Sequence, residues 1–127
     1  MARPRAKELT ERELELMHAF WQQGEITVAQ AREVLNQSDH TLAYTTVATL
    51  VRILTNKGFL KQTNQHRPFR YQPVRSFEEV SGSLLGELMQ NVFGGSREQL
   101  LMRLVEQKKL TPQERALLED VLREQKK

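Results

Sequence analysis

The amino-acid sequence predicts a mainly α-helical protein in which three helices and a two-stranded hairpin are followed by three further helices. Two observations predict this fold class. Helix-start signals, in which a Ser or Thr precedes a Glu or Gln by three residues, recur along the chain, and apolar residues follow them at helical spacing. One stretch after Gly58 differs, because aromatic and polar residues alternate there in two short runs, which is typical of strands.

Five helix-start signals, together with apolar residues at helical spacing, predict six helices. The signals are Thr10 with Glu13, Thr27 with Gln30, Ser76 with Glu79, Ser96 with Gln99, and Thr111 with Glu114. Glycines at 24, 58 and 94–95 suit the ends of the first, third and fourth helices, since helices often finish at a residue in the left-handed conformation. The predicted helices span residues 11–22, 28–35, 43–56, 77–93, 97–107 and 112–124.

The predicted hairpin lies between the third and fourth helices. Its strands are residues 59–62 and 69–72, and the polar segment 63–68 forms the turn. Pro73 ends the second strand, because proline has no N–H to donate to a neighbouring strand. Three helices followed by such a hairpin form the winged helix-turn-helix pattern. The sequence therefore predicts two domains, a winged helix at 1–75 and a helical segment at 76–127.

Composition disfavours several functional classes. The chain has 127 residues, of which 39% are hydrophobic and 28% charged, as in ordinary globular proteins. No stretch approaches the roughly 20 apolar residues of a membrane span, and no apolar run follows the basic N-terminus, so we expect a cytoplasmic protein without membrane insertion. There is no cysteine, and His18, His40 and His66 are scattered. We therefore expect no metal, no cofactor, no catalytic residues and no enzymatic activity.

The distribution of charge indicates a nucleic-acid partner. The segment 40–75 contains no Asp or Glu, and its basic residues are Arg52, Lys57, Lys61, Arg67, Arg70 and Arg75. A solvated face that is basic by chance usually retains some acidic residues, whereas acids near a phosphate backbone repel it. The sequence thus favours DNA contact, and the alternative is a winged-helix protein-interaction module that never binds DNA.

The third predicted helix has two distinct faces. Its apolar stripe, suited to the core, is Val47, Leu50, Val51 and Leu54. The opposite face holds threonines and Arg52, with no acid and no Glu–Lys pairs, and short hydroxyl side chains let a helix approach a DNA groove closely. The alternative is a surface helix that happens to be rich in threonine. The predicted DNA-contact residues are Tyr44, Thr45, Thr46, Ala48 and Thr49, with Arg52, Lys57, Arg67 and Arg70 as phosphate partners or minor-groove probes.

The second half of the chain carries more apolar residues than a segment of its size can enclose. About fifty residues bury only a modest share of their surface, so pairing two copies would remove the exposure. The alternative is that these helices pack on the winged domain. The predicted interface of a homodimer is Leu85, Leu88, Met89, Val92, Leu101, Leu104, Val105, Leu118, Val121 and Leu122.

Several segments in both halves resemble the penicillinase and methicillin-resistance repressor family. They are residues 44–47, 49–50, 57–59, 67–73, 93–96, 104–107 and 110–114. The resemblance runs from about Leu9 to the C-terminus and implies a homodimeric transcriptional repressor of resistance genes that binds a palindromic operator in double-stranded DNA. It also implies that the recognition helix 43–56 enters the major groove, that the wing 59–72 lies on the backbone, and that the C-terminal helices form the dimer.

The resemblance suggests two modes of induction. In the penicillinase branch a sensor-linked protease cuts the repressor within its dimer helices, and the corresponding candidate cleavage position is Arg103–Leu104. Well-known members carry Asn-Phe at that position, so this chain departs from them. Copper-responsive members carry a cysteine cluster near the C-terminus, and the absence of cysteine excludes that mode here.

Overall fold

A computed structural model describes residues 8–37, 41–107 and 110–125, and it has the mainly helical fold that the sequence predicts. By contacts the chain divides into two compact units, Met1–Leu84 and Leu85–Lys127. The elements, in order, are α1 (Glu11–Gln23), β1 (Ile26–Thr27), α2 (Val28–Asn36), α3 (Tyr44–Lys57), β2 (Leu60–Gln62), β3 (Arg70–Pro73), α4 (Phe77–Asn91), α5 (Arg97–Gln107) and α6 (Pro112–Gln125).

Side chains cap the helices where the sequence predicts. The Thr10 hydroxyl accepts a hydrogen bond from the Glu13 N–H, while the Glu13 carboxylate accepts one from the Thr10 N–H. The four other predicted pairs also form their cap hydrogen bonds. Gly58 ends α3 with φ 88°, a conformation that residues with a Cβ rarely adopt. Local sequence signals therefore set most of the helix boundaries.

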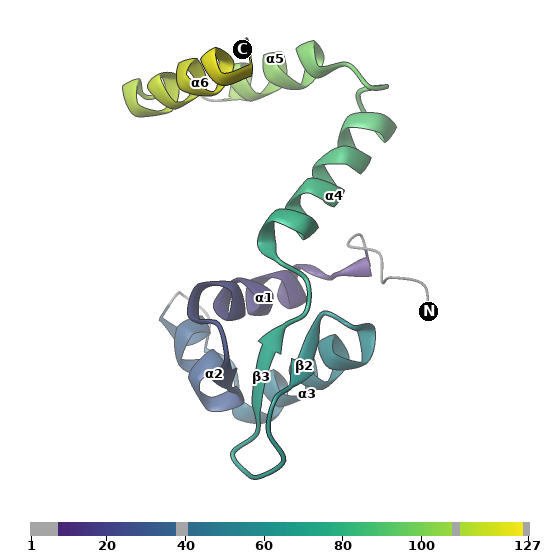
Figure 1. The fold of residues 1–127 in the computed structure, drawn as a ribbon, viewed down its shortest axis with the longest axis vertical. Coiled ribbons are helices and arrows are strands. Elements are labelled where there is room, and N and C mark those ends of the chain that lie inside the picture. The colour runs from purple at the N-terminus through teal and green to yellow at the C-terminus, as the bar shows by residue number, and fades with distance from the viewer. Residues whose placement is uncertain (1–7, 38–40, 108–109, 126–127) are drawn as a thin grey trace. The chain divides into compact units, whose positions relative to one another are not determined.

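The hairpin belongs to a three-stranded antiparallel sheet with the order β1-β3-β2 (Figure 1). Strand β3 is central, because Tyr71 lies opposite both Ile26 of β1 and Gln62 of β2. The two-residue strand β1 was not predicted, since two residues are too few to show the alternation by which strands are recognised. It joins the start of α2 to the hairpin, because Thr27 is paired with Arg70 and also caps α2.

The core of the first unit lies between α1, α2, α3 and the sheet. Its largest fully buried side chains include Phe20 of α1, Leu54 of α3, and Phe59 and Leu60 at the hairpin. Val80 of α4 is also fully buried in this core, and Leu84 packs against it. The first turns of α4 therefore belong to this unit, which extends past the domain boundary predicted after residue 75.

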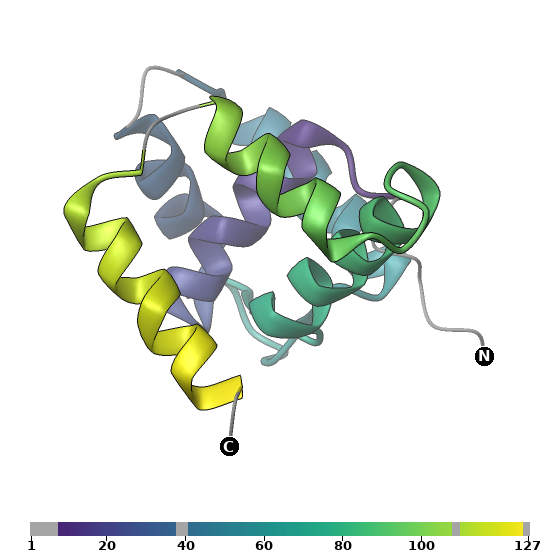
Figure 2. The same ribbon diagram turned by 90° about the horizontal axis from the view of Figure 1, so that it is seen from above.

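The second unit contains the end of α4 together with α5 and α6. In Figure 2, α5 and α6 follow one another as separate helices that are not packed lengthwise, and most of their described apolar side chains are exposed. None of the helices in the described ranges is both long and apolar enough to cross a membrane.

Candidate nucleic-acid interface

Helix α3 separates its side chains into a buried and an exposed face. Val47, Val51 and Leu54 are fully buried, and Leu50 is half-buried against the same core. On the other side, all the predicted contact residues of α3 apart from Ala48 and Lys57 are exposed: Tyr44, Thr45, Thr46, Thr49 and Arg52. Ala48 is half-buried. The exposed face presents hydroxyl groups and one guanidinium group but no carboxylate.

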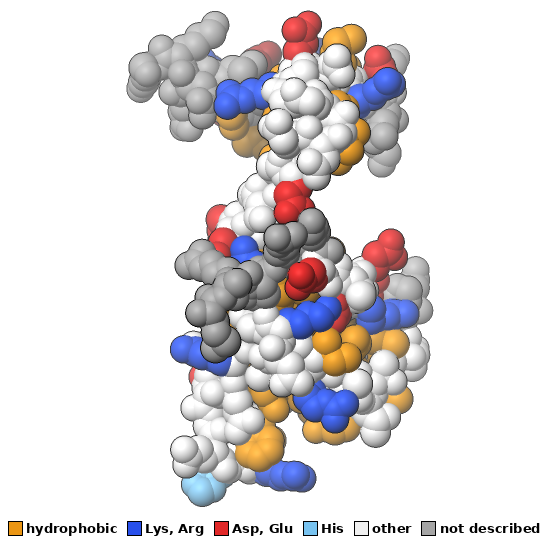
Figure 3. All heavy atoms as spheres, turned by 90° about the vertical axis from the view of Figure 1, so that its right-hand side faces the viewer, with side chains coloured by type: hydrophobic (Ala, Val, Ile, Leu, Met, Phe, Trp, Pro, Cys, Tyr) orange, Lys and Arg blue, Asp and Glu red, His pale blue; other side chains and the backbone are white. Residues whose placement is uncertain are grey.

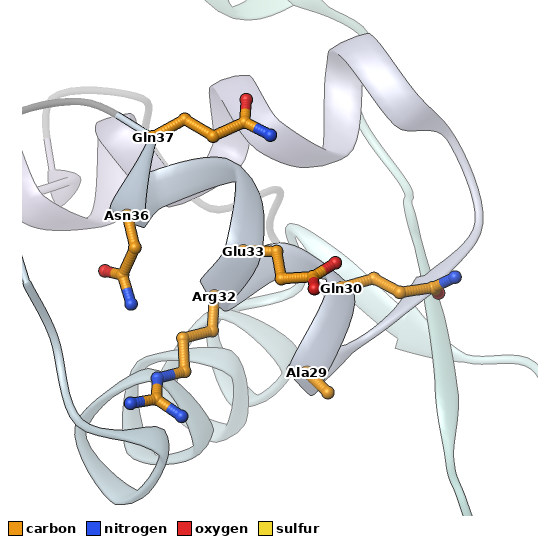
Figure 4. A pocket seen from close by; sticks show the side chains of 6 residues that line it. All are labelled: Ala29, Gln30, Arg32, Glu33, Asn36 and Gln37. Carbon is orange, nitrogen blue, oxygen red and sulfur yellow. The ribbon is translucent and has the colours of Figure 1, made fainter.

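The start of α3 is fixed by side chains of α2. The Arg32 Nε donates to the Leu42 carbonyl at 2.8 Å, and the Asn36 Oδ1 accepts from the Leu42 N–H at 2.9 Å. Figure 4 shows both side chains among those that line a shallow pocket along α2. At Ala43, the residue just before α3, no side chain caps the helix. The N-terminal end of α3 is thus held in place while its first N–H groups lack a side-chain cap.

The Thr49 hydroxyl is already committed as a donor. It donates to the Thr45 carbonyl one turn earlier at 2.9 Å. A threonine hydroxyl has one proton and two lone pairs, so Thr49 presents acceptor sites and a methyl group to the exterior. A partner that bonds this hydroxyl therefore has to supply the hydrogen.

The two wing arginines, Arg67 and Arg70, differ in their surroundings. The guanidinium group of Arg67 lies 5.5 Å from the centre of the Phe69 ring, a cation–π distance. Arg70 lies in β3 with its side chain exposed. The wing, α3, and the end of β1 with the start of α2 line a groove of about 510 Å³ that has no acidic side chain among its lining residues. Its lining residues are Thr27, Val28, Ala29, Tyr44, Ala48, Arg67, Pro68, Phe69 and Tyr71.

The surface charge follows the same pattern. Figure 3 shows one face of the molecule, and the Lys and Arg side chains at its lower end, where the wing lies, have no Asp or Glu beside them. Within the described ranges, no group of three or more His, Cys, Asp or Glu side chains is placed to hold a metal ion.

Two basic residues of the acid-free segment have partners inside the protein. The Lys57 Nζ lies 2.9 Å from Oε1 of Glu13 and donates to the Glu8 carbonyl. Arg75 is 8% exposed, pairs with Glu79 at 3.0 Å and lies over the Phe59 ring. Charge counting within the segment could not separate these two cations from the exposed ones, because Glu13 lies 44 residues from Lys57 and Glu79 lies just outside the segment.

The predicted interface residues of the second unit form exposed apolar faces. Met89 and Leu118 are half-buried, and the Leu122 side chain lies outside the described residues. The other predicted interface residues are exposed: Leu85, Leu88, Val92, Leu101, Leu104, Val105 and Val121. Arg103 and Leu104 lie in the middle of α5 with exposed side chains, and Arg103 pairs with Glu106 at 3.2 Å.

Three helices and a three-stranded sheet, with an arginine-bearing hairpin beside an exposed hydroxyl face of the third helix, define a winged-helix regulator. The chain belongs to the penicillinase repressor family, a family of transcriptional repressors, and residues 9–124 match the family model. The resemblance noted in the sequence is thereby confirmed.

Individual relatives agree with this assignment. The chain is 37% identical over 93 residues to the transcriptional regulator BlaI of Mycobacterium tuberculosis, covering 72% of this chain and 67% of that protein. It is 27% identical over 115 residues to an uncharacterised 16.5 kDa protein of Latilactobacillus sakei, covering 91% of this chain and 78% of that protein. The crystal structure of apo MarR from E. coli has a TM-score of 0.50 at 16% identity, covering 93% of this chain and 78% of MarR, which shows a shared fold.

Proposed function

We propose that the protein is a homodimeric repressor that binds a palindromic operator in double-stranded DNA through α3 and the wing. The observation that carries this proposal is the groove to which both α3 and the wing contribute. Tyr44 and Ala48 of α3 and Arg67 of the wing line the same depression, and none of its lining residues is acidic. A duplex that met the helix would therefore meet the wing cation as well.

In this proposal α3 enters the major groove with its N-terminal half. Threonines at 45, 46 and 49 keep the helix surface shallow, which permits close approach to base edges. Since the Thr49 hydroxyl donates to Thr45, it would accept from an amino group of adenine or cytosine, and its methyl group could contact a thymine methyl. Arg52, on the same exposed face, would bind phosphate.

The wing would contact the phosphate backbone. Arg67 and Arg70 are exposed on the wing, and contacts from such cations to phosphate position a protein on DNA without reading sequence. Lys57 is left out of the proposed contacts, because its ammonium group pairs with Glu13 of α1. It also lies at the end of α3 opposite to Thr45 and Thr49.

The second unit would join two copies. Each large apolar side chain left in water forgoes roughly 1.5–3 kcal/mol, and the exposed residues of α4, α5 and α6 are numerous enough for pairing to be strongly favoured. Two linked binding modules can exceed the affinity of one by a factor of roughly 10²–10⁴. Dimerisation would thus account for tight binding by a small contact face.

The dependence of DNA affinity on dimerisation suggests how DNA would be released. Cleavage at Arg103–Leu104 by a sensor-linked protease would divide α5 and the proposed interface. The peptide bond lies inside a helix, so a protease would first need α5 to open locally. The DNA-contact face would stay intact, and the loss of avidity alone would free the operator.

The test is selection of duplexes from a random library by the purified protein, followed by binding to the selected site and to its half-site. We expect an inverted repeat, bound by two protein chains, and a half-site that is bound at least a hundredfold more weakly, as the lower end of the avidity range implies (about 10²). Failure to enrich any duplex at low salt would contradict DNA binding and favour the protein-interaction alternative.

A further inference from the structure

We propose that Asn64 is a positioning residue that holds the wing in its DNA-binding shape before DNA arrives. The inference rests on the proposed DNA-binding function and adds a residue that contributes without contacting the duplex. Asn64 is half-buried at the start of the loop between β2 and β3, next to the exposed wing arginines.

Both the Nδ2 and the Oδ1 of the Asn64 side chain form hydrogen bonds within the wing. Its Nδ2 donates to the His66 carbonyl at 3.0 Å and to the Pro68 carbonyl at 3.1 Å. Its Oδ1 accepts from the Arg70 N–H at 2.8 Å. The amide therefore ties the second residue of the loop to the carbonyls of His66 and Pro68 and to the first residue of β3.

The other hydrogen bonds of the loop, in the described part of the chain, lie near its base at Gln62, Thr63 and Arg70. The last main-chain bond of the hairpin runs from the Thr63 N–H to the Arg70 carbonyl at 2.8 Å. In the described part of the chain, no main-chain to main-chain hydrogen bond involves residues 64–69. The Gln62 side chain adds a bond to the Asn64 carbonyl at 2.7 Å, which anchors Asn64 itself. Asn64 thus supplies the side-chain hydrogen bonds that reach the middle of the loop, at His66 and Pro68.

Both wing arginines lie within the reach of this network. Arg67 lies between His66 and Pro68, whose carbonyls both accept hydrogen bonds from Asn64. The N–H of Arg70 donates to the Asn64 Oδ1. A loop that is ordered before binding avoids the entropic cost of being ordered at the moment of contact. An Asn64 that shapes the loop would therefore increase DNA affinity through the arginines.

The test compares Asn64→Ala, Arg67→Ala and the double variant by fluorescence anisotropy on the selected operator. We expect Asn64→Ala to weaken binding about threefold to tenfold, because the loop must then be ordered on the DNA. In the Arg67→Ala background, Asn64→Ala should reduce operator affinity by a clearly smaller factor, since one of the two arginines that Asn64 positions is absent. Gln65→Ala removes a neighbouring exposed amide from the same loop, and we expect it to show no such coupling with Arg67.

Two further readouts separate this role from others. The bonds of Asn64 all lie within the wing, so thermal melting of Asn64→Ala should match the wild type, while hydrogen exchange at the Arg70 amide should become faster. Equal losses in both backgrounds would mean that Asn64 contacts DNA directly and would overturn the proposal, as would unchanged affinity. A wild-type protein that does not bind DNA would instead overturn the proposed function.

Discussion

Lys57 at the end of α3 and Glu13 in the first turn of α1 form an ion pair, with Lys57 Nζ 2.9 Å from Glu13 Oε1 and 3.2 Å from Oε2. Glu13 is 3% exposed and also caps α1 through Thr10. One carboxylate thus starts the first helix and holds the last turn of the third.

Loss of the Lys57 ammonium group should destabilise the fold. Lys57→Met leaves a buried carboxylate without its cation, at a cost of about 1–3 kcal/mol in the free energy of unfolding. Urea denaturation measures this cost. Lys61→Met is the matched control, because the Lys61 side chain is exposed on β2, and it should leave stability nearly unchanged. Operator affinity of folded Lys57→Met should equal that of the wild type, and a large loss would restore Lys57 to the DNA-contact set.

Stability should also fall at acidic pH. Burial raises the pKa of Glu13, but hydrogen bonds from Thr10 and Lys57 outweigh burial and leave the pKa lowered. The unfolded chain therefore takes up this proton at a higher pH than the folded chain. The stabilisation is complete above the pKa of the unfolded chain and is lost as pH falls through the lowered pKa of the folded state. Urea titrations across the acid range should show this fall, and Glu13→Gln should flatten it; an unchanged slope in that variant would argue against the assignment.

Substitution of one exposed leucine should separate the proposed dimer. Leu104 is 56% exposed on α5, and Leu104→Asp would place two carboxylates in a symmetric interface. Sedimentation should show a monomer. The far-ultraviolet circular dichroism spectrum and Trp21 fluorescence should show that the first unit stays folded. Leu104→Met preserves the volume and should remain dimeric. An intact dimer from Leu104→Asp would remove Leu104 from the interface.

Thr49→Val should change base preference more than affinity for DNA in general. Valine keeps the shape of threonine and a methyl group but loses the acceptor that Thr49 presents outward. Duplex selection with the variant should lose preference at one position of each half-site, which corresponds to about 1–3 kcal/mol of discrimination. Identical selected sequences from both proteins would show that Thr49 does not read a base.

The sequence predicted the helices well because their signals are local. A capping threonine and its glutamate or glutamine lie three residues apart, so Thr27 and Gln30 can be paired by inspection. The two faces of α3 followed from spacing in the same way. What local reasoning missed depends on distant contacts. Strand β1 is recognised only from its pairing with β3, and the partner of Lys57 is 44 residues away on α1.

In the candidate site, too, some residues could be predicted from the sequence and others depend on contacts that only the structure shows. Exposed threonines and arginines could be selected from the sequence, and the structure places Tyr44, Ala48 and Arg67 around one groove. The roles of Asn64 and Asn36 could not be inferred, because an asparagine in a polar loop or at a helix end is common. Only the positions of their hydrogen-bond partners show that they hold the wing and the start of α3.

We propose that α3 and the wing of each subunit contact one duplex, and the salt dependence of operator binding tests this proposal most directly. Each neutralised phosphate contributes about −0.9 to the slope of log affinity against log salt. We expect a steep slope for the wild type. For Arg67→Ala the slope should be shallower by about 1.8, since a homodimer loses two such contacts (about 0.9 each). A flat response, or a slope that Arg67→Ala leaves unchanged, would contradict the account.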